Sequence, residues 1–147
     1  MGEKGYNTNL AAEYHVMSVL HRLGMNASLT LGNKKSVDIV VIPGPGESIT
    51  LDVKGVAGKN DWLVGRQPRE PRENHFAILV GFGGTIAELQ TVPEVWVLPD
   101  AQFLSLIQTA STGNAWFIRR KDMKSESMKA YLNAWAQLES QYRERGG

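Results

Sequence analysis

The sequence predicts an α/β fold in which a mixed β-sheet is flanked by helices. Apolar residues recur at helical spacing in the first segment, where Leu10, Tyr14, Met17 and Leu20 share one face. Two apolar runs joined by a Pro-Gly turn follow, and the second run alternates apolar and polar residues as a strand does. A further helical pattern closes the chain. This order is typical of helices packed around a mixed sheet.

The first helix is expected from Asn7 to about Arg22, because this stretch contains neither Pro nor Gly. Asn7 or Thr8 can serve as its N-cap, and Gly24 can end it. Glu13 falls beside the apolar stripe of this helix, which is an unusual place for a carboxylate. We therefore treat Glu13 as a candidate functional residue, with the alternatives that it reaches solvent or pairs with a lysine.

Strands are expected through the middle of the chain, at 27–31, 37–42, 49–54, 75–82, 94–98 and 116–118. The run 37–42 is apolar except for Asp38 and is typical of a central strand. The turn at 43–46 joins this run to 49–54 as a hairpin. Residues 55–74 form a long connection rich in Gly and Pro, and a loop of this length in a small domain is usually functional or mobile.

Two helices are expected after the last long strand. Asp100 can cap one that runs to about Ala110, and one long amphipathic helix is expected from Ser125 to just before Gly146. The apolar stripe of the long helix predicts core packing, with a homodimer interface as the alternative. We expect a single domain over 1–147, with its core at about 4–100 and the C-terminal helices at about 100–145.

Composition excludes several classes of function. The 147 residues include 16 Lys and Arg against 15 Asp and Glu, so any contact with nucleic acid must come from a local patch. The absence of cysteine excludes disulfides, thiol catalysis and cysteine zinc sites. No apolar run is long enough to span a membrane, and the first residues do not form a signal peptide. These features predict a cytoplasmic protein with no membrane partner.

Two acids and a lysine on the hairpin form the strongest candidate site. Pairing of 37–42 with 49–54 brings Asp38 beside Asp52, and the two-residue period of a strand puts Asp52 and Lys54 on one face. Carboxylates are the ligands that Mg²⁺ or Mn²⁺ prefers, and the backbone carbonyl of Val53 is a further candidate ligand. The alternatives are an exposed Asp52–Lys54 ion pair and an Asp38 carboxylate bonded to a loop N–H.

The pattern Asp38 … Asp52-Val53-Lys54 resembles the signature of the PD-(D/E)XK nuclease superfamily, in which an acid precedes acid-x-Lys on neighbouring strands. Glu13 matches the additional helical Glu of many members. The opening helix followed by a strand hairpin is most similar to the Holliday-junction-resolvase and restriction-endonuclease-like branch. The resemblance covers about residues 4–100.

The resemblance implies a restriction-endonuclease-like three-layer fold and hydrolysis of phosphodiester bonds in DNA with Mg²⁺ or Mn²⁺. It implies that Asp38 and Asp52 ligate the metal ion, that Lys54 positions the attacking water, and that Glu13 holds a second metal ion or its water. A catalytically inert module of the same fold that binds nucleic acid or protein is the main alternative. A nuclease subunit that needs a larger assembly is another.

Basic residues near the candidate site are expected to contact the nucleic acid. Lys34 and Lys35 lie just before Asp38 in the sequence and are the better candidates for phosphate contacts. Lys59 and Arg66 could follow the phosphate backbone while Trp62 stacks on a base, although acidic neighbours make simple surface solvation an equal alternative.

The histidines have no metal-site spacing. His15 and His21 fall on different faces of the first helix, and His75 starts a strand elsewhere in the chain. Structural or surface roles are therefore expected for all of them.

Overall fold

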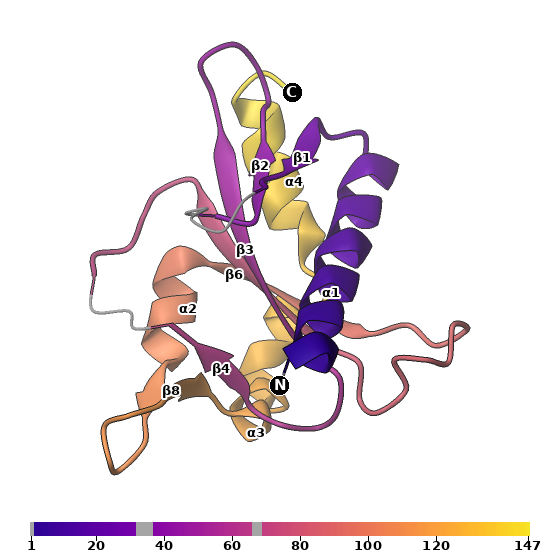
Figure 1. Ribbon diagram of the computed structural model, residues 1–147. Coiled ribbons are helices and arrows are strands. Elements are labelled where there is room, and N and C mark those ends of the chain that lie inside the picture. The colour runs from indigo at the N-terminus through magenta and orange to yellow at the C-terminus, as the bar shows by residue number, and fades with distance from the viewer. Residues whose placement is uncertain (1, 32–36, 66–68) are drawn as a thin grey trace.

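The computed structural model describes residues 2–31, 37–65 and 69–147. The elements are α1 (Gly2–Arg22), β1 (Ala27–Leu29), β2 (Ile39–Val41), β3 (Ile49–Val56), β4 (Trp62–Val64), β5 (His75–Gly81), β6 (Glu94–Pro99), α2 (Asp100–Leu106), β7 (Gln108–Thr109), β8 (Trp116–Ile118), α3 (Arg120–Met123), the 3-10 helix η1 (Glu126–Tyr131) and α4 (Trp135–Glu144). They form a five-stranded sheet in the order β1-β2-β3-β5-β6 and a three-stranded sheet in the order β4-β8-β7 (Figure 1).

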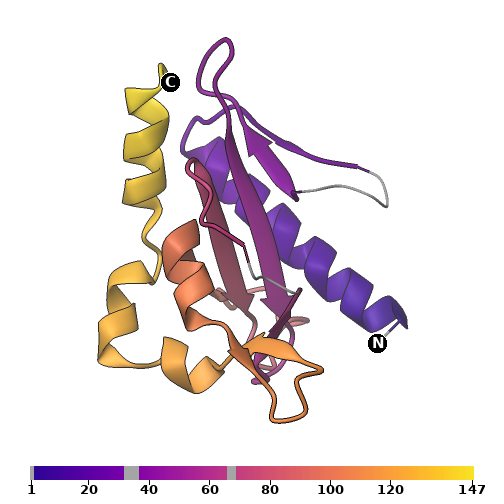
Figure 2. The same cartoon turned by 90° about the vertical axis from the view of Figure 1, so that its left-hand side faces the viewer.

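The five-stranded sheet has a hydrophobic core on each face. One core joins α1 and α4 to the sheet through residues such as Val16, Leu51 and Leu138. The other contains Leu79 and Phe103 and joins the sheet to α2 and the smaller sheet. Figure 2 shows α1 and α2 on opposite sides of β3. The expected mixed sheet flanked by helices is therefore confirmed.

The expected hairpin is also confirmed. Strand β2 pairs antiparallel with β3, with Ile39 opposite Leu51. Strand β3 runs parallel to β5, and β5 runs antiparallel to β6, so the sheet is mixed. The connection between the parallel strands β3 and β5 contains β4, which pairs with β8 in the second sheet. The apolar residues of β3 enter the α1 core, which leaves Thr50, Asp52 and Lys54 on the opposite face.

Helix α1 begins at Gly2, earlier than expected, so the N-cap expected at Asn7 or Thr8 is wrong. The expected end is right and has a clear cause. Gly24 has a φ of 80°, and its N–H donates to the His21 carbonyl at 3.0 Å. The N–H of Met25 donates to the Leu20 carbonyl at 3.0 Å. This pair of bonds is a Schellman motif, which favours glycine at the left-handed position.

The expected cap of α2 is wrong. Pro99 is the N-cap, and Asp100 is the first helical residue, with its carboxylate bonded to the guanidinium of Arg69 instead of to the helix. The helix ends at Leu106, before the expected Ala110, because Gln108 and Thr109 pair with β8. A helical pattern in the sequence was therefore interrupted by a tertiary strand pairing.

The long helix expected from Ser125 is also wrong, because the chain breaks between η1 and α4. Asn133 has a φ of 52°, and its N–H donates to the Val95 carbonyl at 2.7 Å. Leu132 forms an isolated bridge with Trp96. These contacts cover the outer edge of β6, whose backbone groups would otherwise lack partners in the sheet.

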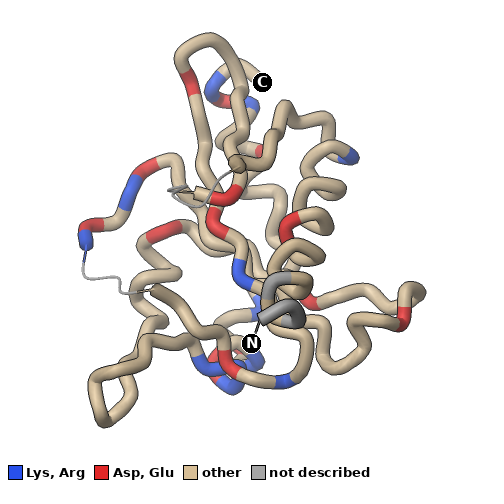
Figure 3. The backbone as a smooth tube through the Cα atoms, in the orientation of Figure 1, with Lys and Arg blue, Asp and Glu red and all other residues tan. Residues whose placement is uncertain are grey.

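Two observations on the surface agree with the composition. Acidic and basic positions are interspersed along the chain (Figure 3), as its formal charge of +1 requires. Within the described ranges, none of the helices combines the length and apolar character needed to cross a membrane.

Candidate functional site

The β2–β3 hairpin brings Asp38 and Asp52 to neighbouring positions. Asp38 directly precedes β2, and its N–H donates to the Leu51 carbonyl at 3.0 Å, which continues the pairing of the hairpin. The ladder ends at the Ile39–Leu51 pair, so Asp38 and Asp52 each lie one residue beyond it, at the same end of the hairpin. The Oδ2 atom of Asp38 also accepts a hydrogen bond from the Val53 N–H at 2.7 Å. The expected alternative was a bond from a loop N–H, whereas the observed donor, Val53, lies on strand β3.

The register of β3 determines where the Val53 carbonyl points. Thr50 and Val56 bond to the β5 side through their backbone groups, at 2.9 and 3.0 Å. Backbone groups of alternate residues in a strand point to opposite neighbours. Leu51 and Val53 therefore face the β2 side, where the Val53 N–H already meets the Asp38 carboxylate. The Val53 carbonyl lies on the same edge of β3 as that carboxylate.

A cavity of about 560 Å³ opens at this edge of the sheet. Four of the expected catalytic and metal-binding residues line it: Glu13 from α1, Asp38 from the start of β2, and Val53 and Lys54 from β3. Glu13 is only 6% exposed, so α1 holds a buried carboxylate at the cavity wall. The structure thus brings Glu13 and the hairpin residues together. Asp52 is not one of the described residues that line this cavity.

The Asp52 carboxylate meets two basic side chains on the α2 side of the sheet. Its Oδ2 lies 3.1 Å from His75 Nε2 and 3.6 Å from the nearer guanidinium nitrogen of Arg72. The side chain of His75 is 1% exposed, and its Nδ1 lies 2.7 Å from the hydroxyl of Thr50. Sequence reasoning assigned His75 a structural or surface role, and it considered Arg72 only as a basic residue of the 55–74 connection that could follow a phosphate backbone or face solvent. The signal that could have found His75 is its position at the start of a strand paired with β3.

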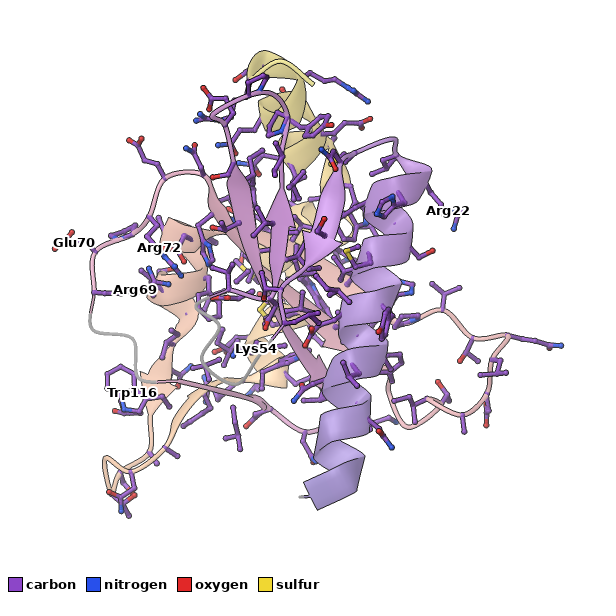
Figure 4. The ribbon with its side chains drawn as sticks, turned by 45° about the horizontal axis from the view of Figure 1, so that its top comes forward. Arg22, Lys54, Arg69, Glu70, Arg72 and Trp116 are labelled. Carbon is purple, nitrogen blue, oxygen red and sulfur yellow. The ribbon has the colours of Figure 1, made fainter. Side chains whose placement is uncertain are left out.

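Asp100 anchors the segment that carries Arg72. The guanidinium of Arg69 donates to both carboxylate oxygens of Asp100, at 2.5 and 3.0 Å. The backbone N–H of Arg72 donates to Asp100 Oδ2 at 2.8 Å. Burial alone would raise the pKa of the Asp100 carboxyl, but the hydrogen bonds from Arg69 and from the Arg72 backbone outweigh it and lower that pKa below its usual value. The same Asp100 contact raises the pKa of Arg69. Figure 4 shows Arg69 and Arg72 beside α2.

The donor set fits a magnesium ion held by few protein ligands. Asp38, Asp52 and the Val53 carbonyl offer oxygen atoms at one part of the hairpin, and Mg²⁺ is usually bound by one or two carboxylates together with water and phosphate. Among the residues described, no group of three or more His, Asp or Glu side chains is arranged to hold a metal ion.

The expected contacts to nucleic acid need one correction. Trp62 is 1% exposed, packs edge-on against Trp96 with ring centroids 5.6 Å apart, and donates from Nε1 to the Val80 carbonyl at 3.2 Å. A ring buried in this way cannot stack on a base, because its faces are covered by the core. Lys59 is exposed, as a phosphate contact requires. Lys34, Lys35 and Arg66 lie outside the described residues.

No family model and no curated protein matches this chain. Among solved structures, the chain is similar to a bacterial homing endonuclease, I-Ssp6803I, with a TM-score of 0.59 and 16% sequence identity. The similarity covers 94% of this chain and 93% of that chain. At this identity it establishes the fold alone. The chain therefore has a mixed α/β fold similar to that of a nuclease, while membership of the PD-(D/E)XK superfamily stays a prediction.

Proposed function

We propose that this chain is a metal-dependent endonuclease that hydrolyses phosphodiester bonds in DNA. One observation carries the proposal: Glu13, Asp38, Val53 and Lys54, which come from separate elements, line one cavity in a fold similar to that of an endonuclease. An acid at the start of one strand and acid-x-Lys on the next is an arrangement suited to phosphodiester hydrolysis. In this structure Glu13, Asp38 and Val53 supply oxygen atoms to the cavity and Lys54 supplies a cation, while Asp52 lies two residues before Lys54 on β3.

In this mechanism Asp38, Asp52 and the Val53 carbonyl hold Mg²⁺ or Mn²⁺. A metal ion bound there supplies positive charge that activates a water molecule and stabilises the negative charge of the phosphate in the transition state. The ammonium of Lys54 faces the cavity and orients the attacking water. The carboxylate of Glu13 accepts a hydrogen bond from water at the cavity wall.

The substrate is proposed as DNA because the site requires a phosphodiester and the exposed Lys59 lies close in sequence to the end of β3. With a formal charge of +1, affinity must depend on a local contact surface and should fall steeply as salt screens it. Branched or junction DNA, nicked duplex and linear duplex all satisfy this chemistry. A homodimer and a larger assembly are also compatible with it.

A second candidate function is a catalytically inert module that binds nucleic acid. The observation that favours it is the pairing of Asp52 with His75 and Arg72, which is how a purely structural carboxylate would be held. In that case the cavity beside Lys54 would bind phosphate without a metal ion.

The decisive experiment measures cleavage of branched, nicked and linear DNA by purified protein with Mg²⁺ or Mn²⁺. We expect Asp38→Asn and Asp52→Asn to lose cleavage, because each removes a charged ligand while keeping the size of the side chain. Glu88→Gln is the matched control, since Glu88 is exposed and lies outside the cavity. DNA binding should persist in all variants.

Far-ultraviolet circular dichroism and a thermal melt would show that the variants fold. A wild-type protein that binds all three DNA forms and cuts none of them, with either metal ion, would favour the inert module. So would variants at Asp38 and Asp52 that cut DNA as well as the wild type does.

A further inference from the structure

Arg72 places a protein cation against a proposed metal ligand. Its guanidinium lies 3.6 Å from Asp52 Oδ2 and 2.9 Å from His75 Nε2. The Arg72 side chain is 39% exposed, whereas the Asp52 side chain is 18% exposed. The guanidinium is therefore the more exposed member of this pair and the Asp52 carboxylate the more buried one.

The backbone of Arg72 is anchored independently of its side chain. Its N–H donates to Asp100 Oδ2 at 2.8 Å, and Arg69 binds both oxygens of the same carboxylate. The side chain of Asp100 is fully buried, so this anchor is part of the folded core. By contrast, Arg72 Nε is 3.9 Å from Asp100, too far for a hydrogen bond. The guanidinium can turn while the backbone stays in place.

The contacts around His75 Nε2 cannot all be hydrogen bonds at once. This single nitrogen lies 2.9 Å from Arg72 and 3.1 Å from Asp52. If it carries a proton it can donate to Asp52, and if it carries a lone pair it can accept from Arg72. Its other nitrogen has the Thr50 hydroxyl as a partner in either case, because a hydroxyl can donate or accept. His75 can therefore hold Asp52 without Arg72, or hold Arg72 without Asp52, with no movement of the ring.

We propose that Arg72 neutralises Asp52 while no divalent ion is bound, and turns to a phosphate group of the DNA when a metal ion takes that carboxylate. The proposal rests on the proposed function, because it needs Asp52 to be a metal ligand. A divalent ion and a guanidinium beside the same carboxylate repel each other, so we expect metal binding to move the guanidinium away from Asp52. A planar guanidinium with several donors then matches the oxygens of a phosphate. Arg69 cannot take this role, because Asp100 occupies its donors.

The first test is a titration of the full chain with Mn²⁺ in the absence of DNA, followed by calorimetry. We expect Arg72→Gln to bind Mn²⁺ more tightly than the wild type, by about fivefold, because a competing charge near the ligand is gone. Arg72→Lys should restore the wild-type affinity for the metal ion. Arg143→Gln is the control: Arg143 is an exposed arginine on α4 that pairs with Glu139.

The second test measures the affinity of the full chain for linear duplex DNA in a buffer that contains Ca²⁺ as the divalent ion. Here Arg72→Gln should bind more weakly than the wild type, by about tenfold, because one charge-assisted phosphate contact is lost. A residue with a purely structural role would weaken both metal and DNA binding, or neither. Opposite changes in the two affinities are specific to the proposed exchange.

Each outcome decides the proposal. An Mn²⁺ affinity that is unchanged or lower in Arg72→Gln overturns the role of Arg72, even if the wild type binds Mn²⁺ through Asp52. If the wild type binds no Mn²⁺, or if Asp52→Asn binds it equally well, the metal site itself fails and the Arg72 proposal falls with it. Because Arg72→Gln keeps the backbone N–H to Asp100, its thermal melt should match that of Arg143→Gln.

Discussion

The polar face of β3 has two ends whose charges are satisfied in different ways. At the Asp52 end, His75 and Arg72 contact the carboxylate, and the buried Asp100 anchors the segment behind them. At the Lys54 end, the side chain faces a cavity of about 560 Å³ that Glu13 also lines. One end is closed by protein partners, and the other is open to a ligand.

The difference shows how a small domain separates charged residues that stabilise the fold from charged residues that can bind a ligand. A buried charge that already has its partners contributes to the native structure, and removing one partner is costly. A charged side chain that lines an accessible cavity can bind a ligand from solution. Asp52 lies at the closed end but only two residues from Lys54 on the same face of β3, which is why we infer that its partner changes. Substitutions at one end at a time can test this difference.

The largest effect is expected at the open end. Lys54→Ala should lower DNA cleavage by about 100-fold, because the cation that orients water and stabilises charge is lost. Lys121→Ala should change cleavage only slightly, because Lys121 is exposed and does not line the cavity. Single-turnover cleavage of a labelled duplex measures both. Equal losses in the two variants would show that Lys54 acts only through general attraction of DNA.

Substitutions at the closed end should lower the stability of the fold. Asp100→Asn leaves Arg69 without its buried counter-charge and should lower the free energy of unfolding by about 2–3 kcal/mol. Glu126→Gln breaks an exposed pair with Lys129 and should cost less than about 1 kcal/mol. Urea unfolding followed by circular dichroism compares them. Similar small costs would show that the Arg69–Asp100 pair does not hold this segment.

The stabilisation from Asp100 should also depend on pH. Its pKa is lowered in the folded protein, so its contribution is present above the ordinary Asp pKa of about 3.9 and is lost as the pH falls through the folded value. The difference in unfolding free energy between wild type and Asp100→Asn should therefore be constant near neutral pH and shrink below about pH 4. A difference that grows as the pH falls would contradict this assignment.

A smaller effect is expected at Gly55, where the close approach of α1 to β3 can be changed without altering a residue of the proposed chemistry. A Cβ atom at Gly55 would lie 2.8 Å from the Cβ of Ala12 and 3.3 Å from the Thr8 carbonyl, so Gly55→Ala must push α1 away from β3. We expect a loss of about 1–3 kcal/mol in stability from this overpacking. Gly58→Ala is the matched control, because the space around Gly58 is open. Equal stabilities would mean that α1 adjusts freely.

The smallest effect is expected for Glu13. Glu13→Gln keeps the shape of the side chain and removes its charge, so stability should hardly change while cleavage falls by about tenfold. Cleavage measured with Mn²⁺ at several concentrations tests this. A loss that higher Mn²⁺ fully reverses would assign Glu13 to metal binding, and a loss that persists would assign it to water. Unchanged cleavage would remove Glu13 from the site.

The sequence by itself determined the local elements and their pairing. Alternation in 49–54 predicted a strand with Asp52 and Lys54 on one face, the Pro-Gly turn predicted the hairpin, and Gly24 predicted the end of α1. These features depend on neighbours in the chain, where periodicity and turn chemistry act directly. The placement of Glu13 at the cavity wall with Asp38 also agrees with its position beside an apolar stripe.

Only the tertiary structure decided which side chains meet across long separations. The contacts of Asp52 with His75 and of Arg69 with Asp100 join distant segments, and no local pattern encodes them. The sequence placed Trp62 in the 55–74 connection as a candidate for base stacking, whereas its position on β4 and its burial against Trp96 depend on how the two sheets pack. The break at Asn133 has the same origin: the amphipathic pattern continues through it, while the uncovered edge of β6 binds the backbone there.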